Sequence, residues 1–169
     1  YTWNSNILQA GIRYDNRKIN TSTHGIEGEE GYFEAIDKQF NSFNASLGYK
    51  TDLSSSISTR INIASGFRAP NLSELTSNGV HEGSNRYEIG NSNLKNEQNF
   101  QVDLNLEYKS EHLEIFANGF YNHINNYIFI TPTGAILDDN FVFDYVQSNA
   151  YLFGGETGIH FHPHPFDWL

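Results

Sequence analysis

Polar and apolar residues alternate along much of this chain. Between residues 100 and 108 the apolar side chains fall at every second position, at Phe100, Val102, Leu104, Leu106 and Tyr108. Polar residues (Gln, Asp, Asn and Glu) occupy the positions between them. Successive side chains of a β-strand point to opposite faces, so this segment predicts a strand with one apolar and one polar face. Because helical periodicity is nearly absent elsewhere, we expect an all-β fold.

Five further segments predict strands, which gives about six in all. Their approximate ranges are 8–14, 43–50, 57–64, 113–130 and 141–161. The last two are the least regular, and in 113–130 the rings of Phe116 and Phe120 share a parity with Asn118 and Asn122. We therefore expect an antiparallel up-and-down meander.

The predicted connections differ systematically in length. Long loops are expected at about 16–40 and 68–97, a medium loop at about 131–140, and short turns at 50–53, 109–112 and 162–167. In a meander, alternating long and short connections place all long loops at one end of the sheet. Outer-membrane β-barrels have this asymmetry, and aromatic residues near both strand ends, such as Tyr108 and Phe100, fit an interfacial girdle. Trp168 is assigned to the same girdle.

Composition excludes several classes of function. The chain of 169 residues has a net charge of -10 and no cysteine, so a disulfide framework and a Cys nucleophile are impossible and a nucleic-acid partner is not expected. No apolar run approaches the roughly 18 residues of a membrane helix, but a barrel strand needs only about ten. No nucleophile-elbow, nucleotide-binding or zincin motif is present, so an enzyme is not expected. Because the chain has no signal peptide and begins in mid-pattern, we expect a partial domain.

Two segments resemble motifs of the TonB-dependent receptors. The string Gly66-Phe67-Arg68-Ala69-Pro70-Asn71-Leu72-Ser73-Glu74-Leu75 is very specific for this family, and residues 90–97 resemble a second motif. The residues that carry the resemblance are Gly66, Phe67, Arg68, Pro70, Asn71, Glu74, Leu75, Gly90, Asn91, Leu94 and Glu97. Ser92 and Asn96 stand where the family usually has proline. Weaker matches follow at residues 119–122 and 154–156.

This resemblance implies that residues 1–169 form part of a barrel of about 22 strands in the outer membrane of a Gram-negative bacterium. It implies uptake of a small-molecule chelate or metal ligand, such as an iron chelate, haem, cobalamin or a metal complex, or of a glycan. The energy arrives through TonB, which contacts an N-terminal segment that is missing here together with the plug. The expected partners are thus outer-membrane lipid, TonB and the ligand, and no resident cofactor is implied.

Candidate site residues lie in loops and on the polar strand faces. His81, Glu82, Arg86 and Glu88 are candidates for ligand binding, because external loops often bind ligands; the alternative is a solvated loop held by its own ion pairs. Charged residues at inward parity are expected to line the barrel lumen: Arg13, Arg60, Asp103, Glu107 and Glu156. Neither His160, His162 and His164 nor Glu27, Glu29 and Glu30 have convincing metal-ligand spacing, so no metal site is expected.

Two alternatives remain open from the sequence. A complete small membrane barrel acting as an adhesin is one, although six strands fall short of the usual minimum of about eight. The other is a soluble β-sandwich that binds carbohydrate or protein, which should be soluble without detergent. An isolated barrel segment should instead expose an apolar face and two sheet edges.

Overall fold

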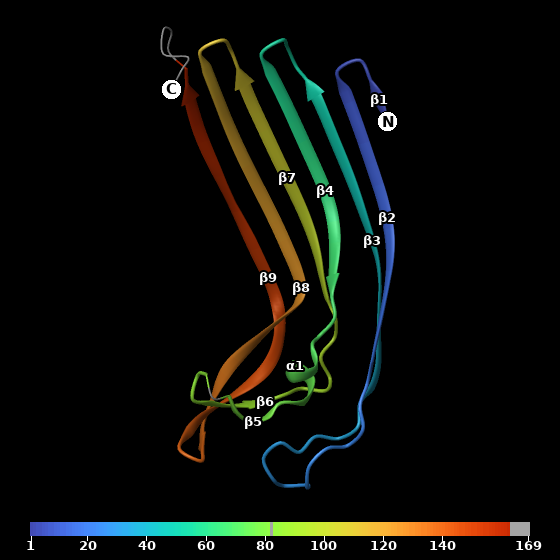
Figure 1. The fold of residues 1–169 in the computed structure, drawn as a ribbon, viewed down its shortest axis with the longest axis vertical. Helices are drawn as coiled ribbons and strands as arrows, with labels where there is room; N and C mark the ends of the chain where they lie inside the picture. The colour runs from blue at the N-terminus through green and yellow to red at the C-terminus, as the bar shows by residue number, and fades with distance from the viewer. Residues whose placement is uncertain (82, 163–169) are drawn as a thin grey trace.

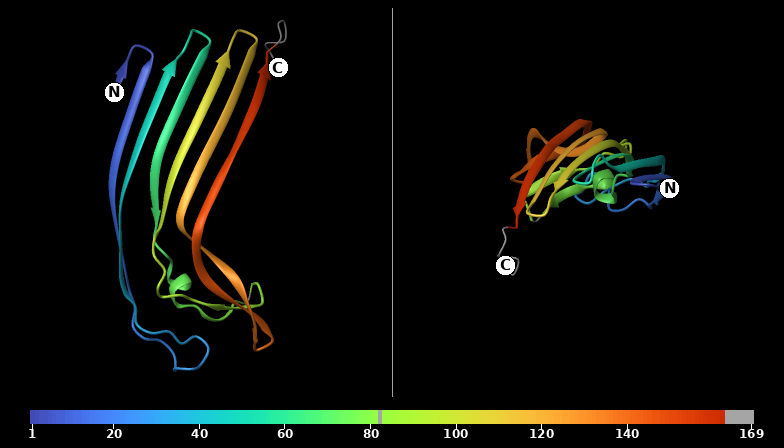
Figure 2. Two further views of the ribbon diagram at one scale, coloured as in Figure 1. Left: turned by 180° about the vertical axis from the view of Figure 1, so that it is seen from behind. Right: turned by 90° about the horizontal axis from the view of Figure 1, so that it is seen from above.

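The computed structural model describes residues 1–81 and 83–162, and in it six long strands form one curved, open sheet (Figures 1 and 2). The long strands are β2 (Asn6–Asn20), β3 (Asp37–Asp52), β4 (Ile57–Arg68), β7 (Glu97–Lys109), β8 (Leu113–Leu137) and β9 (Asn140–Phe161). The shorter elements are β1 (Thr2–Trp3), α1 (Leu72–Thr76), β5 (Asn78–His81) and β6 (Arg86–Ile89). The strand order is β1-β2-β3-β4-β7-β8-β9-β6-β5. The predicted all-β meander of six main strands is therefore confirmed.

Strand pairing sorts the side chains onto two faces. Ile12 lies opposite Ala45, Leu47 opposite Ile63, and Leu104 opposite both Ile61 and Gly119. Residues directly opposite in an antiparallel pair point to the same face, so the predicted apolar positions form one continuous surface. Its side chains are exposed, with 86% of Ile12, 76% of Phe43 and 78% of Phe153 accessible. This apolar face is broader than the patches that soluble monomers usually expose.

The two long connections lie at the same end of the sheet, as the sequence predicts. Residues 53–56 and 110–112 make short turns at one end of the sheet (top in Figure 1). Residues 21–36 and 69–96 connect strands at the other end, where α1, β5 and β6 lie (Figure 1). Residues 163–167 of the predicted turn at 162–167, and the aromatic Trp168, lie outside the described residues.

The predicted medium loop at 131–140 is wrong. Strand β8 continues to Leu137 and β9 begins at Asn140, so only Asp138 and Asp139 form the turn. Both have positive φ values, 48° and 60°, as a tight type I′ hairpin turn requires. Register shifts between Ile124 and Tyr127 and between Pro132 and Ile136 interrupt the alternation, and so hide this part of the strand in the sequence.

The sheet also contains one parallel pair, which a simple meander does not predict. Strand β6 runs parallel to β9, with Arg86 opposite Phe141 and Ile89 opposite Asp144. The long connection after β4 is therefore not an open loop. It crosses the end of the sheet, forms the β5–β6 hairpin and adds this hairpin to the outer part of β9 (Figure 1).

The buried core lies at this loop end, outside the regular part of the sheet. Ile36, Leu75, Leu94 and Ile128 form a cluster, with Ile19 and Tyr145 packed against it. Pro70, in the chain between β4 and α1, is also fully buried. Apolar burial of this kind is the main force that folds the long connection into a defined layer. In the part of the chain that the structure describes, no helix has the length and apolar character needed to span a bilayer.

Candidate functional site

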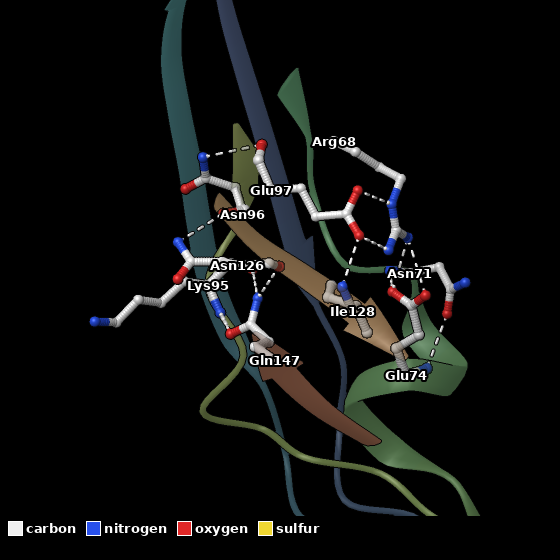
Figure 3. Close-up of polar contacts among 9 residues, drawn as sticks. All are labelled: Arg68, Asn71, Glu74, Lys95, Asn96, Glu97, Asn126, Ile128 and Gln147. Atoms are coloured by element: carbon white, nitrogen blue, oxygen red, sulfur yellow. Dashed lines mark hydrogen bonds and ion pairs between the residues drawn. The ribbon is translucent and has the colours of Figure 1, made fainter. Parts of the chain in front are cut away.

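Arg68, the last residue of β4, connects four elements at the loop end (Figure 3). Its Nε donates to Glu97 Oε2 at 2.8 Å, and Nη2 donates to Glu97 Oε1. Its Nη1 donates to both carboxylate oxygens of Glu74, at 2.9 and 3.0 Å. Glu97 Oε1 also accepts from the Ile128 backbone N–H at 2.8 Å. A single guanidinium thus links β4 to α1 and β7, and Glu97 extends the link to β8. The planar guanidinium of Arg has enough donors to bind both carboxylates at once.

Helix α1 is fixed by its own cap as well as by Arg68. Asn71 Oδ1 accepts from the Glu74 backbone N–H at 2.8 Å, and the Asn71 backbone N–H donates to Glu74 Oε2 at 2.9 Å. This capping box satisfies donors that a helix start otherwise leaves unpaired. The sequence motif therefore encodes a short, rigid helix whose glutamate serves both the cap and Arg68.

The second motif packs against the end of α1. A Cβ at Gly90 would lie 2.5 Å from the backbone nitrogens of Thr76 and Ser77, so only glycine fits here. The Asn91 backbone N–H donates to Glu74 O at 2.9 Å, and its side chain donates to Tyr145 O at 3.3 Å. Leu94 is buried with Leu75 in the core. The two motifs are separated in the chain by β5 and β6 but pack against each other in the structure.

A bulge in β8 contributes residues that the motifs did not indicate. Asn126 has a φ of 56° and donates from Nδ2 to Asn96 O at 3.3 Å. Gln147 on β9 donates from Nε2 to Lys95 O and Asn126 O, both at 2.8 Å, and accepts from the Lys95 N–H at 2.9 Å (Figure 3). The tendency of Asn to adopt positive φ is the only local indication of this site.

The predicted ligand-binding residues lie on the β5–β6 hairpin. His81 is exposed and lies opposite Arg86 in the hairpin, and Glu82 lies outside the described residues. Arg86 Nε donates to Glu88 Oε1 at 2.7 Å, and the Arg86 guanidinium lies 5.6 Å from the centre of the Phe143 ring. The Tyr145 hydroxyl donates to Glu88 Oε2 at 2.7 Å. Both oxygens of Glu88 are engaged within the protein, while His81 faces solvent.

These contacts set the charge states of Glu88 and Tyr145. Burial is the largest influence on Glu88 and by itself raises its pKa. The hydrogen bonds from Tyr145 and Arg86 and the charge of Arg86 together outweigh burial, so the pKa of Glu88 is lowered. Burial and the hydrogen bond to Glu88 raise the pKa of Tyr145 to about 12. Glu88 is therefore an anion held by a neutral phenol and a guanidinium.

The five charged residues predicted to line a lumen share one face of the sheet. Arg13 lies opposite Asn44, Arg60 opposite Asn105, and Glu156 opposite Asn118. Asp103 and Glu107 lie at the same parity on β7. They are spread over four strands rather than gathered in one site. Two of them accept from neighbouring amides: Gln101 Nε2 donates to Asp103 Oδ1 at 2.8 Å, and Asn118 Nδ2 donates to Glu156 Oε1 at 2.9 Å. Their place along a lumen stays a prediction.

The same polar face also carries two aromatic rings, from Phe116 and Phe120. The β8–β9 register places these residues opposite Gly158 and Gly154. The ring of Phe120 covers Gly154, where a Cβ would lie 2.9 Å from the ring. Each glycine thus leaves space for a neighbouring ring on a face that is otherwise polar.

Among the described residues 1–81 and 83–162, no group of three or more His, Asp or Glu side chains is placed to hold a metal ion. Of the histidines His160, His162 and His164, the last lies outside the described residues.

An open sheet with an exposed apolar face, a polar opposite face and all long connections at one end defines a segment of a membrane β-barrel. A family model described as TonB dependent receptor-like, β-barrel, matches residues 1–169. The chain belongs to this family.

Solved structures agree on the fold. The copper transporter OprC superposes with a TM-score of 0.76 at 17% identity, over 97% of this chain and 25% of that one. The siderophore receptor PirA from Pseudomonas aeruginosa gives 0.59 at 22% identity, over 88% and 30%. The hemophore receptor HasR of Serratia marcescens gives 0.67 at 14% identity, over 94% and 29%. The chain thus spans between a quarter and a third of the length of these proteins.

Proposed function

We propose that this chain forms part of the wall and mouth of an outer-membrane receptor that imports a scarce nutrient with energy supplied through TonB. The observation that carries the proposal is the sheet with two unlike faces. One face exposes aliphatic and aromatic side chains suited to lipid, and the other carries amides and charges suited to a wet bore. In this proposal the protein is a transporter and not an enzyme.

The proposed ligand is a metal ion or metal chelate. The neighbours that share the fold are named for copper, a siderophore, and haem with its hemophore. Cobalamin and glycans belong to the wider range implied by the sequence motifs. The alternative of a soluble module that binds carbohydrate or protein has less support. A soluble β-sandwich buries its apolar side chains between two layers, whereas those of this sheet are exposed.

The test uses the complete receptor in cells with and without TonB. We expect accumulation of at least one of ferric siderophore, haem or Cu²⁺, supplied as radiolabelled probes, and loss of this accumulation in cells lacking TonB. Equal accumulation in both strains would overturn the proposal. So would a full reading frame without a plug-like domain.

Within this function, we propose that exposed His81 and half-buried Arg86 contribute to the external ligand surface. His81→Ala should weaken binding of the transported probe several-fold by removing a ligand or donor. Arg86→Ala should also weaken it, because Glu88 loses its charged partner. His160→Ala is the matched control, since His160 is also exposed but lies near the short turns. If His81→Ala and Arg86→Ala bind and transport like wild type, this hairpin is not the ligand site.

A further inference from the structure

Loop 21–36 is attached to the free edge of the β5–β6 hairpin. Strand β5 ends the nine-stranded order, so one side of it has no neighbouring strand in the described sheet. The Gly31 backbone N–H donates to Asn78 O, and Glu30 Oε1 accepts from the Val80 N–H at 2.8 Å. A backbone amide and a carboxylate thereby satisfy edge groups that a further strand would otherwise pair.

The side chain of Asn78 makes the attachment specific. Its Nδ2 donates to the backbone carbonyls of Glu29 and Tyr32, both at 3.1 Å. Its Oδ1 accepts from the Tyr87 hydroxyl at 2.8 Å. Asn78 thus joins the loop on one side to β6 on the other, and nearly all of its amide hydrogen-bonding capacity is used.

Gly79 provides the space for this arrangement. A Cβ at position 79 would lie 2.8 Å from Glu30 Oε1 and 3.0 Å from Glu30 Cγ. Any side chain there displaces the carboxylate that accepts from Val80. The loop itself turns at Gly25, Gly28 and Gly31, all with positive φ, and its last residue, Ile36, is buried in the core cluster.

The hairpin is in turn joined to β9. Strand β6 pairs with residues 141–144, and Glu88 accepts from the Tyr145 hydroxyl. A continuous set of hydrogen bonds therefore runs from loop 21–36 through β5 and β6 to the outer part of the β8–β9 hairpin. All three external connections of the described chain participate in it.

We propose that Asn78 is a positioning residue that couples loop 21–36 to the β5–β6 hairpin, so that the three external connections behave as one body before any ligand arrives. This coupling holds His81 at a fixed place relative to loop 21–36. Its consequence for ligand capture rests on the proposed function, but the coupling itself does not.

The test is hydrogen–deuterium exchange on the complete, ligand-free receptor in detergent micelles. Asn78→Ala should accelerate amide exchange in residues 21–36 and 78–81 by roughly tenfold or more, since several hydrogen bonds of ordinary strength are lost together. Exchange in β7 and in the inner half of β8 should not change. Gly79→Ala should accelerate the same two segments less, because it displaces Glu30 without removing the Asn78 amide.

Asn93→Ala is the matched control, because the Asn93 side chain makes no hydrogen bond within the described residues and lies in the same long connection. It should leave residues 21–36 unchanged. Exchange in 21–36 that is the same in Asn78→Ala and Asn93→Ala would overturn the proposal. So would acceleration spread evenly over the barrel strands, which indicates a loss of global stability instead of a lost attachment. Because no ligand is used, failure here is distinguishable from failure of the proposed transport function.

Discussion

At the scale of single residues, the family motif consists largely of side chains that hold the loop layer to the sheet. Arg68 forms ion pairs with the carboxylates of both Glu74 and Glu97, and each of these two residues is only 8% exposed. An isolated buried carboxylate is costly, so the guanidinium matters most through the two charges that it compensates. The motif thus has a structural explanation that is independent of any ligand.

Arg68→Ala is therefore expected to destabilise the loop layer. Removing one member of a buried pair costs about 3–5 kcal/mol, and partial exposure of Arg68 reduces this to about 2–3 kcal/mol. Arg68→Lys should recover little, because an ammonium cannot bridge both carboxylates in the same geometry. The measurement is amide exchange at residues 69–76 and 125–130 of the intact receptor.

Arg13→Ala is the control for this experiment. Arg13 also forms an ion pair, with Asp15 at 2.8 Å, but its side chain is 67% exposed. Exposed pairs contribute about 0–1 kcal/mol, so the loss should be small and confined to β2. Equal effects of Arg13→Ala and Arg68→Ala would contradict the assigned role of Arg68.

At the scale of elements, the parallel attachment of β6 to β9 depends on the charge of Glu88. The folded pKa of Glu88 lies below the ordinary carboxyl value of 4.5. Its contribution to stability is therefore complete above pH about 4.5 and is lost as pH falls through the lower, folded pKa. Tyr145 remains the neutral donor throughout this range, since its pKa is raised to about 12.

Acidification should consequently release the β5–β6 hairpin from β9 before the barrel unfolds. In wild type we expect the protection factors of amides in residues 78–81 and 83–89, corrected for the pH dependence of intrinsic exchange, to fall below pH about 4.5. Glu88→Gln should start less stable at neutral pH and show a flatter pH dependence in this segment. A profile in Glu88→Gln that keeps the wild-type slope would assign the pH effect to another group.

Alternation of polar and apolar residues predicts the regular strands but not the bulged strand β8. Regular alternation located β2, β3, β4 and β7, although each extends beyond its predicted range. The bulge at Ile124/Tyr127 changes the parity of β8, and a second irregularity at Pro132/Ile136 interrupts its pairing, so the hairpin end was predicted as a loop. A bulge depends on how two strands pair, so one strand's sequence gives little warning of it.

At the scale of the whole molecule, the two faces of the sheet predict how the receptor tolerates charge. Leu104 lies in the middle of β7 on the apolar face and is 53% exposed, while Asn105 is its neighbour on the polar face. Leu104→Arg should impair assembly in the outer membrane, because a cationic side chain near the bilayer midplane lowers the stability of the folded barrel by about 2–4 kcal/mol. Asn105→Arg should be tolerated, because its side chain lies on the polar face, which we propose lines the bore.

The measurement is the fraction of complete receptor that reaches the outer membrane as a folded barrel, assessed by heat-dependent mobility on gels. The two substitutions introduce the same side chain at adjacent positions, so the added charge is matched. Similar assembly of both variants would be incompatible with a lipid-facing role for the apolar face.

The sequence by itself determined the two-faced strands, the separation of long and short connections, and the family. These features follow from local patterns: the side-chain period of a strand, turn composition, and a motif of ten consecutive residues. It also placed Arg13, Arg60, Asp103, Glu107 and Glu156 at a common parity, which the register reproduces.

Only the tertiary structure decided which distant residues meet in the loop layer. Tyr145 and Glu88 are 57 positions apart, Asn78 and Glu29 are 49 apart, and Arg68 reaches Glu97 across 29. No periodicity encodes such pairs, because they arise when long connections fold over the end of the sheet and bury Ile36, Leu75, Leu94 and Ile128 together. Burial of this small core brings the polar partners within hydrogen-bonding distance, and their geometry then selects one arrangement.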